Sequence, residues 1–158
     1  MAGAEQEFAL APLSAGRLYV NQRARSFRRV AWLTGPRDNE VELRADKSRI
    51  EPGCHAGVLR LRKDVDGQSV LLFSNPPNRN PHPDRFYPQA RHGLTVRMSL
   101  DGGRTWTKSK ELEGGLSAYS DLAEGPDGTI YCIYETGESF YSENIVVARF
   151  GMEWLKAK

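Results

Sequence analysis

The stretch Ser99–Trp106 reads Ser-Leu-Asp-Gly-Gly-Arg-Thr-Trp and continues the candidate strand Leu94–Ser99. Its pattern is the Asp-box, whose fixed positions are Ser99, Asp101, Gly103, Thr105 and Trp106. We expect Asp101 to cap backbone N–H groups of a tight hairpin, Gly103 to supply an unusual backbone dihedral, and Trp106 to fill space between sheets. The motif therefore predicts a fold and carries no catalytic information.

Short apolar runs separated by turn residues extend along the whole chain, which is typical of an all-β protein. The candidate strands are Arg17–Gln22, Arg29–Leu33, Gly57–Arg62, Ser69–Ser74, Leu94–Ser99, Tyr119–Leu122, Thr129–Glu135 and Ile145–Phe150. The candidate turns between them include Asp66-Gly67, Asp101–Gly103, Glu113–Gly115 and Pro126–Gly128. Proline-rich Asn75–Arg91 is expected to be a long ordered loop, and only Met152–Lys156 is expected to be helical.

A weaker copy of the strand-and-turn unit follows the candidate strand Arg29–Leu33, where Thr34–Asn39 occupies the turn. Units that recur at a few tens of residues are typical of a β-propeller. At roughly 40–50 residues per blade, the chain provides about three blades, whereas closed propellers have about four to eight. We expect a partial β-propeller that is incomplete or that assembles with something else.

Composition excludes several classes of protein. The 158 residues are 39% hydrophobic and include 15 glycines, so neither a disordered tail nor a fibre is indicated. The formal charge of +2, from 22 basic and 20 acidic residues, predicts no nucleic-acid partner. No apolar run is long enough for a membrane helix, and the start of the chain does not resemble a secretory signal, so the location stays open. The two cysteines, Cys54 and Cys132, are expected to be buried thiols.

A second group of motifs lies in the last third of the chain. It consists of Ala-Tyr-Ser-Asp-Leu at Ala118–Leu122, Gly-Pro-Asp-Gly at Gly125–Gly128 and Ile-Tyr-Glu at Ile133–Glu135. This group closely resembles the C-terminal segment of the exo-α-sialidases (neuraminidases). Four further pieces agree with the resemblance: Arg-His-Gly at 91–93, Asn-Gln-Arg at 21–23, Glu-Pro-Gly-Cys at 51–54, and Glu7, sixteen residues before Arg23.

The resemblance implies a partial six-bladed propeller in which residues 1–158 are the C-terminal portion of the domain. It also implies roles for five residues: Tyr119 as nucleophile, Glu7 as its activating base, Arg23 and Arg91 as substrate arginines, and Glu135 as the residue that orients a further arginine. The implied partners are sialylated glycans and the missing N-terminal half of the propeller. No metal or organic cofactor is implied.

The chemistry of a sialic acid explains these residue types. Its carboxylate sits on the anomeric carbon, and guanidinium groups such as those of Arg23 and Arg91 hold carboxylates through bidentate hydrogen bonds. The same carboxylate would repel an Asp or Glu nucleophile, whereas the neutral phenol of Tyr119 avoids that repulsion. Because a free tyrosine has a pKa of about 10, the phenol needs a neighbouring base, which the resemblance identifies as Glu7.

The family pattern also contains an N-terminal arginine and an acid/base aspartate, and only six residues precede Glu7. Two local sequences also differ from the pattern, Gln6-Glu7 in place of Asn-Glu and Ala15-Gly16 in place of Asp-Gly. We therefore expect the C-terminal part of a sialidase, inactive by itself. The alternatives are a non-catalytic propeller that binds sialylated glycans or a protein, and a half-propeller that closes by dimerisation.

Plainer interpretations exist for most of these residues. Glu7 could be a solvated terminal residue, Tyr119 a core aromatic and Glu135 a charge at a strand end. Neighbouring arginines compete with the assigned ones: Arg25, Arg28 and Arg29 with Arg23, and Arg85 and Arg97 with Arg91. The histidines lack metal-ligand spacing and are interpreted as loop or surface residues: His55, His82 and His92.

Overall fold

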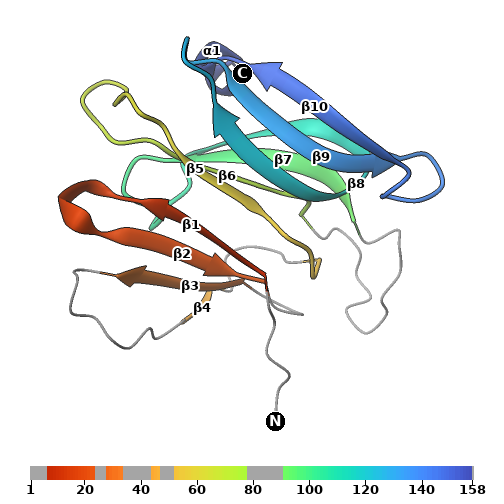
Figure 1. The fold of residues 1–158 in the computed structure, drawn as a ribbon, viewed down its shortest axis with the longest axis horizontal. Helices are drawn as coiled ribbons and strands as arrows, with labels where there is room; N and C mark the ends of the chain where they lie inside the picture. Colours follow the sequence, from red (N-terminus) through yellow and green to blue (C-terminus); the bar gives the residue numbers. More distant parts are fainter. Residues whose placement is uncertain (1–6, 24–27, 34–43, 47–51, 78–90, 158) are drawn as a thin grey trace.

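The computed structural model describes residues 7–23, 28–33, 44–46, 52–77 and 91–157, and the arrangement is almost entirely β (Figure 1). A four-stranded antiparallel sheet comes first, in the order β1-β2-β3-β4. Its elements are β1 (Phe8–Pro12), the 3-10 turn η1 (Ser14–Gly16), β2 (Leu18–Gln22), β3 (Arg28–Leu33) and β4 (Arg44–Asp46). The predicted strands over β2 and β3 are confirmed, while β1 and β4 were not predicted.

A second antiparallel sheet has six strands in the order β10-β9-β8-β7-β6-β5. Its strands are β5 (Gly57–Arg60), β6 (Leu71–Asn75), β7 (His92–Ser99), β8 (Lys108–Glu124), β9 (Ile130–Gly137) and β10 (Asn144–Phe150). A short helix, α1 (Met152–Lys156), follows with the bounds that the sequence predicts. Thr34–Asn39 and most of the proline-rich Asn75–Arg91 lie outside the described residues.

Strand β8 belongs to two structural units, which corrects the turn predicted at Glu113–Gly115. Its first part pairs with β7 and its second part pairs with β9. The register against β7 shifts between the pairs Leu94↔Glu113 and His92↔Leu116, so Gly114 and Gly115 form a bulge inside a continuous strand. Gly114 and Gly115 thus allow β8 to change its pairing partner from β7 to β9, and they do not reverse the chain.

This passage divides the described chain into three successive units, β1–β4, β5 to the first part of β8, and the second part of β8 to β10. The first strands of these units lie next to one another, with β1 beside β5 and β5 beside the second part of β8. At Gly57 in β5, a Cβ would lie only 2.8 Å from the Cα of Asp121 in β8, so the two strands approach closely. The arrangement agrees with the expected three blades, because the first strands of propeller blades line a common axis.

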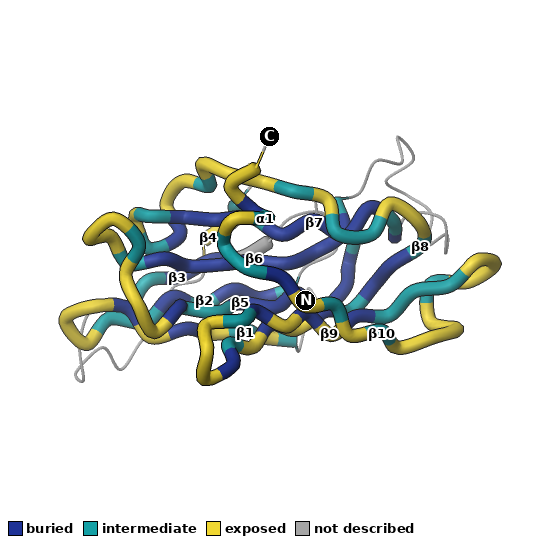
Figure 2. Tube along the Cα trace, turned by 90° about the horizontal axis from the view of Figure 1, so that it is seen from above, coloured by how far each residue is buried: buried dark blue, intermediate teal, exposed yellow. Residues whose placement is uncertain are grey.

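Two apolar cores hold the units together. One lies between the first sheet and β5–β6 and includes Tyr19, Val30 and Phe73. The other lies within the curved second sheet and under α1, where Leu94, Ile130 and Leu155 are buried. Figure 2 shows the buried stretches of β6 and β7 in the middle of the molecule and exposed turns around them.

The Asp-box forms the tight turn between β7 and β8. The Asp101 carboxylate accepts the backbone N–H groups of Arg104 (3.0 Å) and Thr105 (2.8 Å) and the hydroxyl of Thr105 (2.6 Å). Gly103 has φ +86°, and a Cβ there would lie 2.6 Å from the Tyr19 ring, so glycine is required twice over. Trp106 packs edge-on against Tyr19 and tilted against Phe73, between the two sheets.

Replacing Asp101 with alanine is expected to lower the free energy of unfolding by about 1–3 kcal/mol, because the turn loses an acceptor shared by several donors. Burial raises the pKa of Asp101, but the hydrogen bonds from Thr105, Ser99 and Arg104 lower it more, so the pKa lies below its usual value. The stabilisation is therefore present above the unfolded pKa of about 3.9 and is lost as the pH falls through the folded value. Urea unfolding of Asp101→Ala and Asp101→Asn at pH 7 and pH 3 measures this; equal loss at both pH values would contradict it.

Candidate active site

Glu7 and Arg23 lie side by side because β1 and β2 form a hairpin. Glu7 immediately precedes β1 and Arg23 immediately follows β2, where Phe8 pairs with Gln22. The backbone N–H of Arg23 donates to the carbonyl oxygen of Glu7 at 3.0 Å, one step beyond the paired strands. The sixteen-residue spacing noted in the sequence is therefore the length of one closed hairpin.

Tyr119 lies in a further irregularity of β8, which affects its pairing with β9. Between the pairs Ser117↔Thr136 and Ser120↔Tyr134, two residues of β8 face the single residue Glu135 of β9. Such a bulge turns a side chain out of the regular alternation and is often found beside active sites. The backbone N–H of Tyr119 consequently donates to the side-chain Oε2 of Glu135 at 3.3 Å.

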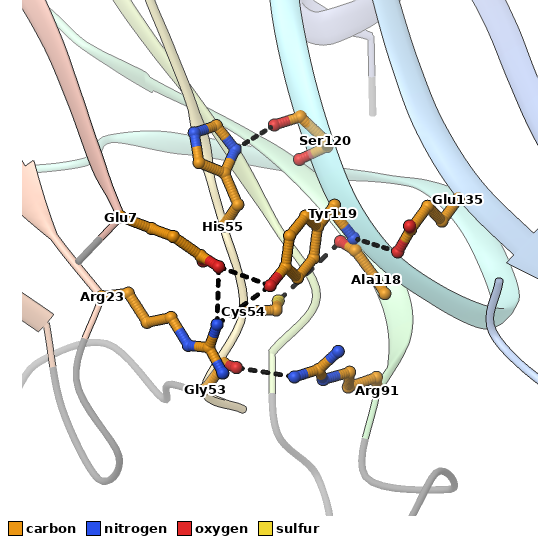
Figure 3. A network of polar contacts seen from close by, with 10 residues as sticks. All are labelled: Glu7, Arg23, Gly53, Cys54, His55, Arg91, Ala118, Tyr119, Ser120 and Glu135. Atoms are coloured by element: carbon orange, nitrogen blue, oxygen red, sulfur yellow. Dashed lines mark hydrogen bonds and ion pairs between the residues drawn. The ribbon is translucent and has the colours of Figure 1, made fainter. Parts of the chain in front are cut away.

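The side chains of Glu7, Arg23 and Tyr119 meet in one hydrogen-bonded triangle (Figure 3). The Tyr119 hydroxyl donates to Glu7 Oε1 at 2.5 Å, and Arg23 Nη1 donates to Glu7 Oε1 at 2.7 Å and to the Tyr119 oxygen at 2.9 Å. Glu7 precedes β1, Arg23 follows β2 and Tyr119 lies inside β8, so residues up to 112 positions apart in the chain meet here. A phenol held against a carboxylate in this way can pass its proton over one short hydrogen bond.

Partial burial and close charges shift the pKa values of Tyr119 and Arg23 in the triangle. Desolvation and the hydrogen bond to Glu7 raise the pKa of Tyr119, although the charges of Arg23 and Arg91 act in the opposite direction. Desolvation lowers the pKa of Arg23, but the charges of Glu7 and Tyr119 and the hydrogen bond to Glu7 together outweigh it, so the pKa is raised. The resting site therefore holds a neutral phenol between a charged carboxylate and a permanently charged guanidinium.

Arg91 approaches the triangle from the start of β7. Its side chain is buried, with the whole residue 7% exposed, and its Nη2 donates to the carbonyl oxygen of Gly53 at 2.7 Å. Its Cζ lies 5.7 Å from the centre of the Tyr119 ring. Gly53 has φ +71° and belongs to the Pro52–Cys54 segment before β5, within the loop that the sequence singled out. Figure 3 shows the guanidinium groups of Arg23 and Arg91 on the same side of Tyr119.

His55, which was interpreted from the sequence as a loop or surface residue, lies on the other side of Tyr119. Its ring centre is 6.0 Å from that of Tyr119, and its Nδ1 lies 3.1 Å from the carbonyl oxygen of Ser120. With Tyr119 and Glu135 it lines an open pocket of about 230 Å³ that extends along the face of β9 and β10. Glu7 before β1, His55 before β5 and Tyr119 inside β8 occupy equivalent places at the beginnings of neighbouring first strands, while Arg23 follows β2 and Arg91 precedes β7.

The described residues also place the two cysteines and the competing arginine Arg97. Cys54 and Cys132 are buried thiols, and burial raises the pKa of the Cys132 thiol to about 12. The described residues contain no group of three or more potential metal ligands. Within the same described ranges, no helix has the length and apolar character needed to cross a bilayer. The competing arginine Arg97 pairs with Asn75 and Phe73, while His82 and Arg85 lie outside the described residues.

Comparison with known proteins found sialidases by sequence and by structure. No protein-family model matches the chain. A curated sialidase of Micromonospora viridifaciens is 35% identical over 150 residues, which are 90% of this chain and 21% of that protein. The chain thus spans about a fifth of that relative's length.

Solved structures of similar proteins share the fold. The intramolecular trans-sialidase of Ruminococcus gnavus, in complex with oseltamivir carboxylate, matches 99% of this chain with 35% of its own, at a TM-score of 0.78 and 19% identity. A Hadza microbial sialidase matches 94% of the chain with 27% of its own, at a TM-score of 0.66 and 28% identity. The fold class predicted from the sequence, part of a β-propeller, is thereby confirmed.

Proposed function

Because this chain is homologous to part of the bacterial sialidases, we propose that it supplies the nucleophile, the base and two substrate arginines of a retaining exo-α-sialidase. The observation that carries the proposal is the short hydrogen bond between the Tyr119 hydroxyl and Glu7, bridged by Arg23. A core tyrosine or a glycan-binding surface does not require a base at hydrogen-bonding distance from the phenol. The triangle supports an enzyme over a purely binding propeller.

In the proposed reaction, Tyr119 Oη attacks the anomeric carbon of a terminal sialic acid while its proton passes to Glu7 Oε1. The bond to the leaving oxygen breaks, and that oxygen takes a proton from the acid/base aspartate that the resemblance places outside this chain. Water then attacks the anomeric carbon and gives a proton to that aspartate, which is now a carboxylate. The bond to the Tyr119 oxygen breaks, and Glu7 returns its proton to that oxygen. Two displacements at one carbon retain the anomeric configuration.

The substrate carboxylate is proposed to bind Arg23 and Arg91, which lie on the same side of Tyr119 in Figure 3. Their charges stabilise the phenolate that leaves in the second step as well as the bound carboxylate. Glu135, which holds the backbone N–H of Tyr119, is proposed to orient a further arginine contributed from outside the chain.

The remaining blades of the propeller are the proposed partner of two exposed apolar faces. On the last unit, Tyr131, Ile133, Ile145 and Val147 share the outward face of β9 and β10, with Ile145 74% exposed. On the first unit, Phe8 and Leu10 face away from the core that their neighbours Ala9 and Ala11 help to form. Large exposed apolar faces on a sheet mark contact surfaces, and the longer relatives contain further chain to cover them.

Val147→Glu tests this partner. In the isolated chain, where Val147 is 59% exposed, we expect the free energy of unfolding to change by no more than about 0.5 kcal/mol. In a hybrid in which this chain replaces the matching segment of the Micromonospora sialidase, we expect a loss of about 3 kcal/mol or more from a charge buried without a partner. Urea unfolding measures both, with exposed Lys108→Glu as the control; equal effects in the two settings would exclude the proposed contact.

The same hybrid tests the function. We expect it to release the fluorophore from a fluorogenic α-sialoside, and we expect NMR to detect the α-anomer of sialic acid as the first product. A folded hybrid that binds the sialoside without turnover would instead support the non-catalytic propeller. A first product in the β-configuration would contradict the covalent tyrosine intermediate.

A further inference from the structure

The turn between β9 and β10 brings Tyr141 against Arg91, fifty positions away in the sequence. The Arg91 Cζ lies 4.6 Å from the centre of the Tyr141 ring, closer than its 5.7 Å separation from the Tyr119 ring. A guanidinium over an aromatic face is attracted by the ring quadrupole, and burial strengthens the attraction. With Arg91 only 7% exposed, this contact is largely shielded from water.

The turn that carries Tyr141 is held by its own hydrogen bonds. The Glu143 carboxylate accepts the backbone N–H groups of Glu138 at 2.8 Å and Phe140 at 2.9 Å. A side chain at Gly137 would collide with the carbonyl oxygen of Phe140, so the turn folds tightly back on the end of β9. Phe140 stacks on Tyr141 with ring centres 4.2 Å apart and planes inclined at 28°. The Tyr141 ring is therefore supported independently of Arg91.

Arg91 is restrained on three sides. The Gly53 carbonyl oxygen accepts one Nη2 hydrogen, the Tyr141 ring contacts the guanidinium, and the Tyr119 ring lies further off. Arginine side chains have many rotamers, and a carboxylate bound by a guanidinium that is already oriented incurs a smaller loss of conformational entropy. Gly53 fixes one nitrogen atom only, so a second contact is needed to set the plane of the group.

We propose that Tyr141 is a positioning residue that sets the orientation of Arg91 for the carboxylate of a sialic acid. The inference rests on the proposed function of Arg91 and extends it to the β9–β10 turn. Tyr141 contacts the arginine and takes no part in proton transfer. The face of its ring, and not its hydroxyl, performs the role, so phenylalanine is expected to substitute for it.

The test uses the full 158-residue chain and two measurements. The first is the Nε–H signal of Arg91 in ¹⁵N NMR spectra, assigned by its loss in Arg91→Lys. The second is the dissociation constant of N-acetylneuraminic acid, with its methyl ester as the uncharged control. We expect Tyr141→Phe to preserve both, and Tyr141→Leu to remove the ring-current shift of the Arg91 signal and to weaken acid binding about fivefold to tenfold. Glu143→Gln weakens the turn but keeps the Tyr141 ring. We expect it to shift the Arg91 signal and weaken acid binding in the same direction as Tyr141→Leu, but by less.

The outcomes separate the two proposals. If Tyr141→Leu leaves the Arg91 signal unchanged, Tyr141 does not position Arg91, whatever the affinity. If the signal changes and the affinity for the acid does not, the inference is also overturned, because orientation then has no bearing on the carboxylate. If Arg91→Lys itself leaves acid binding unaltered, the proposed function of Arg91 fails. Thermal unfolding of each variant shows whether it still folds. If Tyr141→Leu does not fold, Glu143→Gln replaces it in both measurements.

Discussion

Tyr119→Phe in the hybrid enzyme is expected to lower kcat by about 10³-fold or more while KM changes only severalfold. The substitution removes one oxygen atom and leaves the ring in place. The ring centre lies 6.0 Å from the centre of the His55 ring and 5.7 Å from Arg91 Cζ. The proposed carboxylate ligands remain, so ground-state binding persists. Only the atom that is proposed to form the covalent bond is lost, and an interaction confined to the transition state appears in kcat.

Tyr134→Phe is the matched control. Tyr134 lies on the neighbouring strand β9, is 6% exposed, and has its pKa raised by burial. Its loss of a hydroxyl is expected to leave turnover unchanged because no base of the proposed site contacts it. Steady-state kinetics on the fluorogenic sialoside measure both variants. If Tyr119→Phe retains a tenth of the wild-type turnover, Tyr119 is not the nucleophile.

Local sequence signals predicted much of the fold because they depend on nearby residues. Strand β10 was expected at Ile145–Phe150 and spans Asn144–Phe150, and α1 has the predicted bounds. Strand β1 (Phe8–Pro12) was missed because its alanines and proline carry little intrinsic strand preference, and pairing with β2 holds it in place. The length of β8 was missed for a related reason, since only its two successive partners, β7 and β9, keep it extended past Gly114.

For the site too, contacts within a short stretch of chain differ from contacts between distant strands. The proximity of Glu7 and Arg23 follows from one hairpin, but the sequence pointed to it only through the family resemblance, because strand β1 was not predicted. The meeting of Tyr119 with Glu7 joins units far apart in the chain, so the sequence pointed to it only through family resemblance. Gly53 and Tyr141 were not identified as neighbours of Arg91, because a carbonyl acceptor and a ring face leave no distinctive pattern in the sequence.

Glu7→Gln is expected to lower kcat about 10²- to 10⁴-fold although it makes the Tyr119 phenol easier to ionise. Burial raises the pKa of Tyr119, and the hydrogen bond and charge of Glu7 raise it further, whereas Arg23 and Arg91 lower it. An uncharged amide removes the Glu7 charge and leaves both arginines, so the pKa of Tyr119 falls. The difference in phenolate absorbance between Glu7→Gln and Glu7→Gln/Tyr119→Phe, followed against pH, measures this shift.

The two results together distinguish proton transfer during attack from attack by phenolate formed beforehand. If phenolate formed beforehand were the nucleophile, Glu7→Gln would be the faster enzyme in the alkaline range, where more of its Tyr119 is ionised. If Glu7 accepts the proton as the bond forms, the variant is slow at every pH despite its lower phenol pKa. The raised pKa of Tyr119 favours the second alternative, because the phenol in the wild-type site is harder to ionise than a free tyrosine. An alkaline rate for Glu7→Gln equal to or above that of the wild type would reject Glu7 as the base.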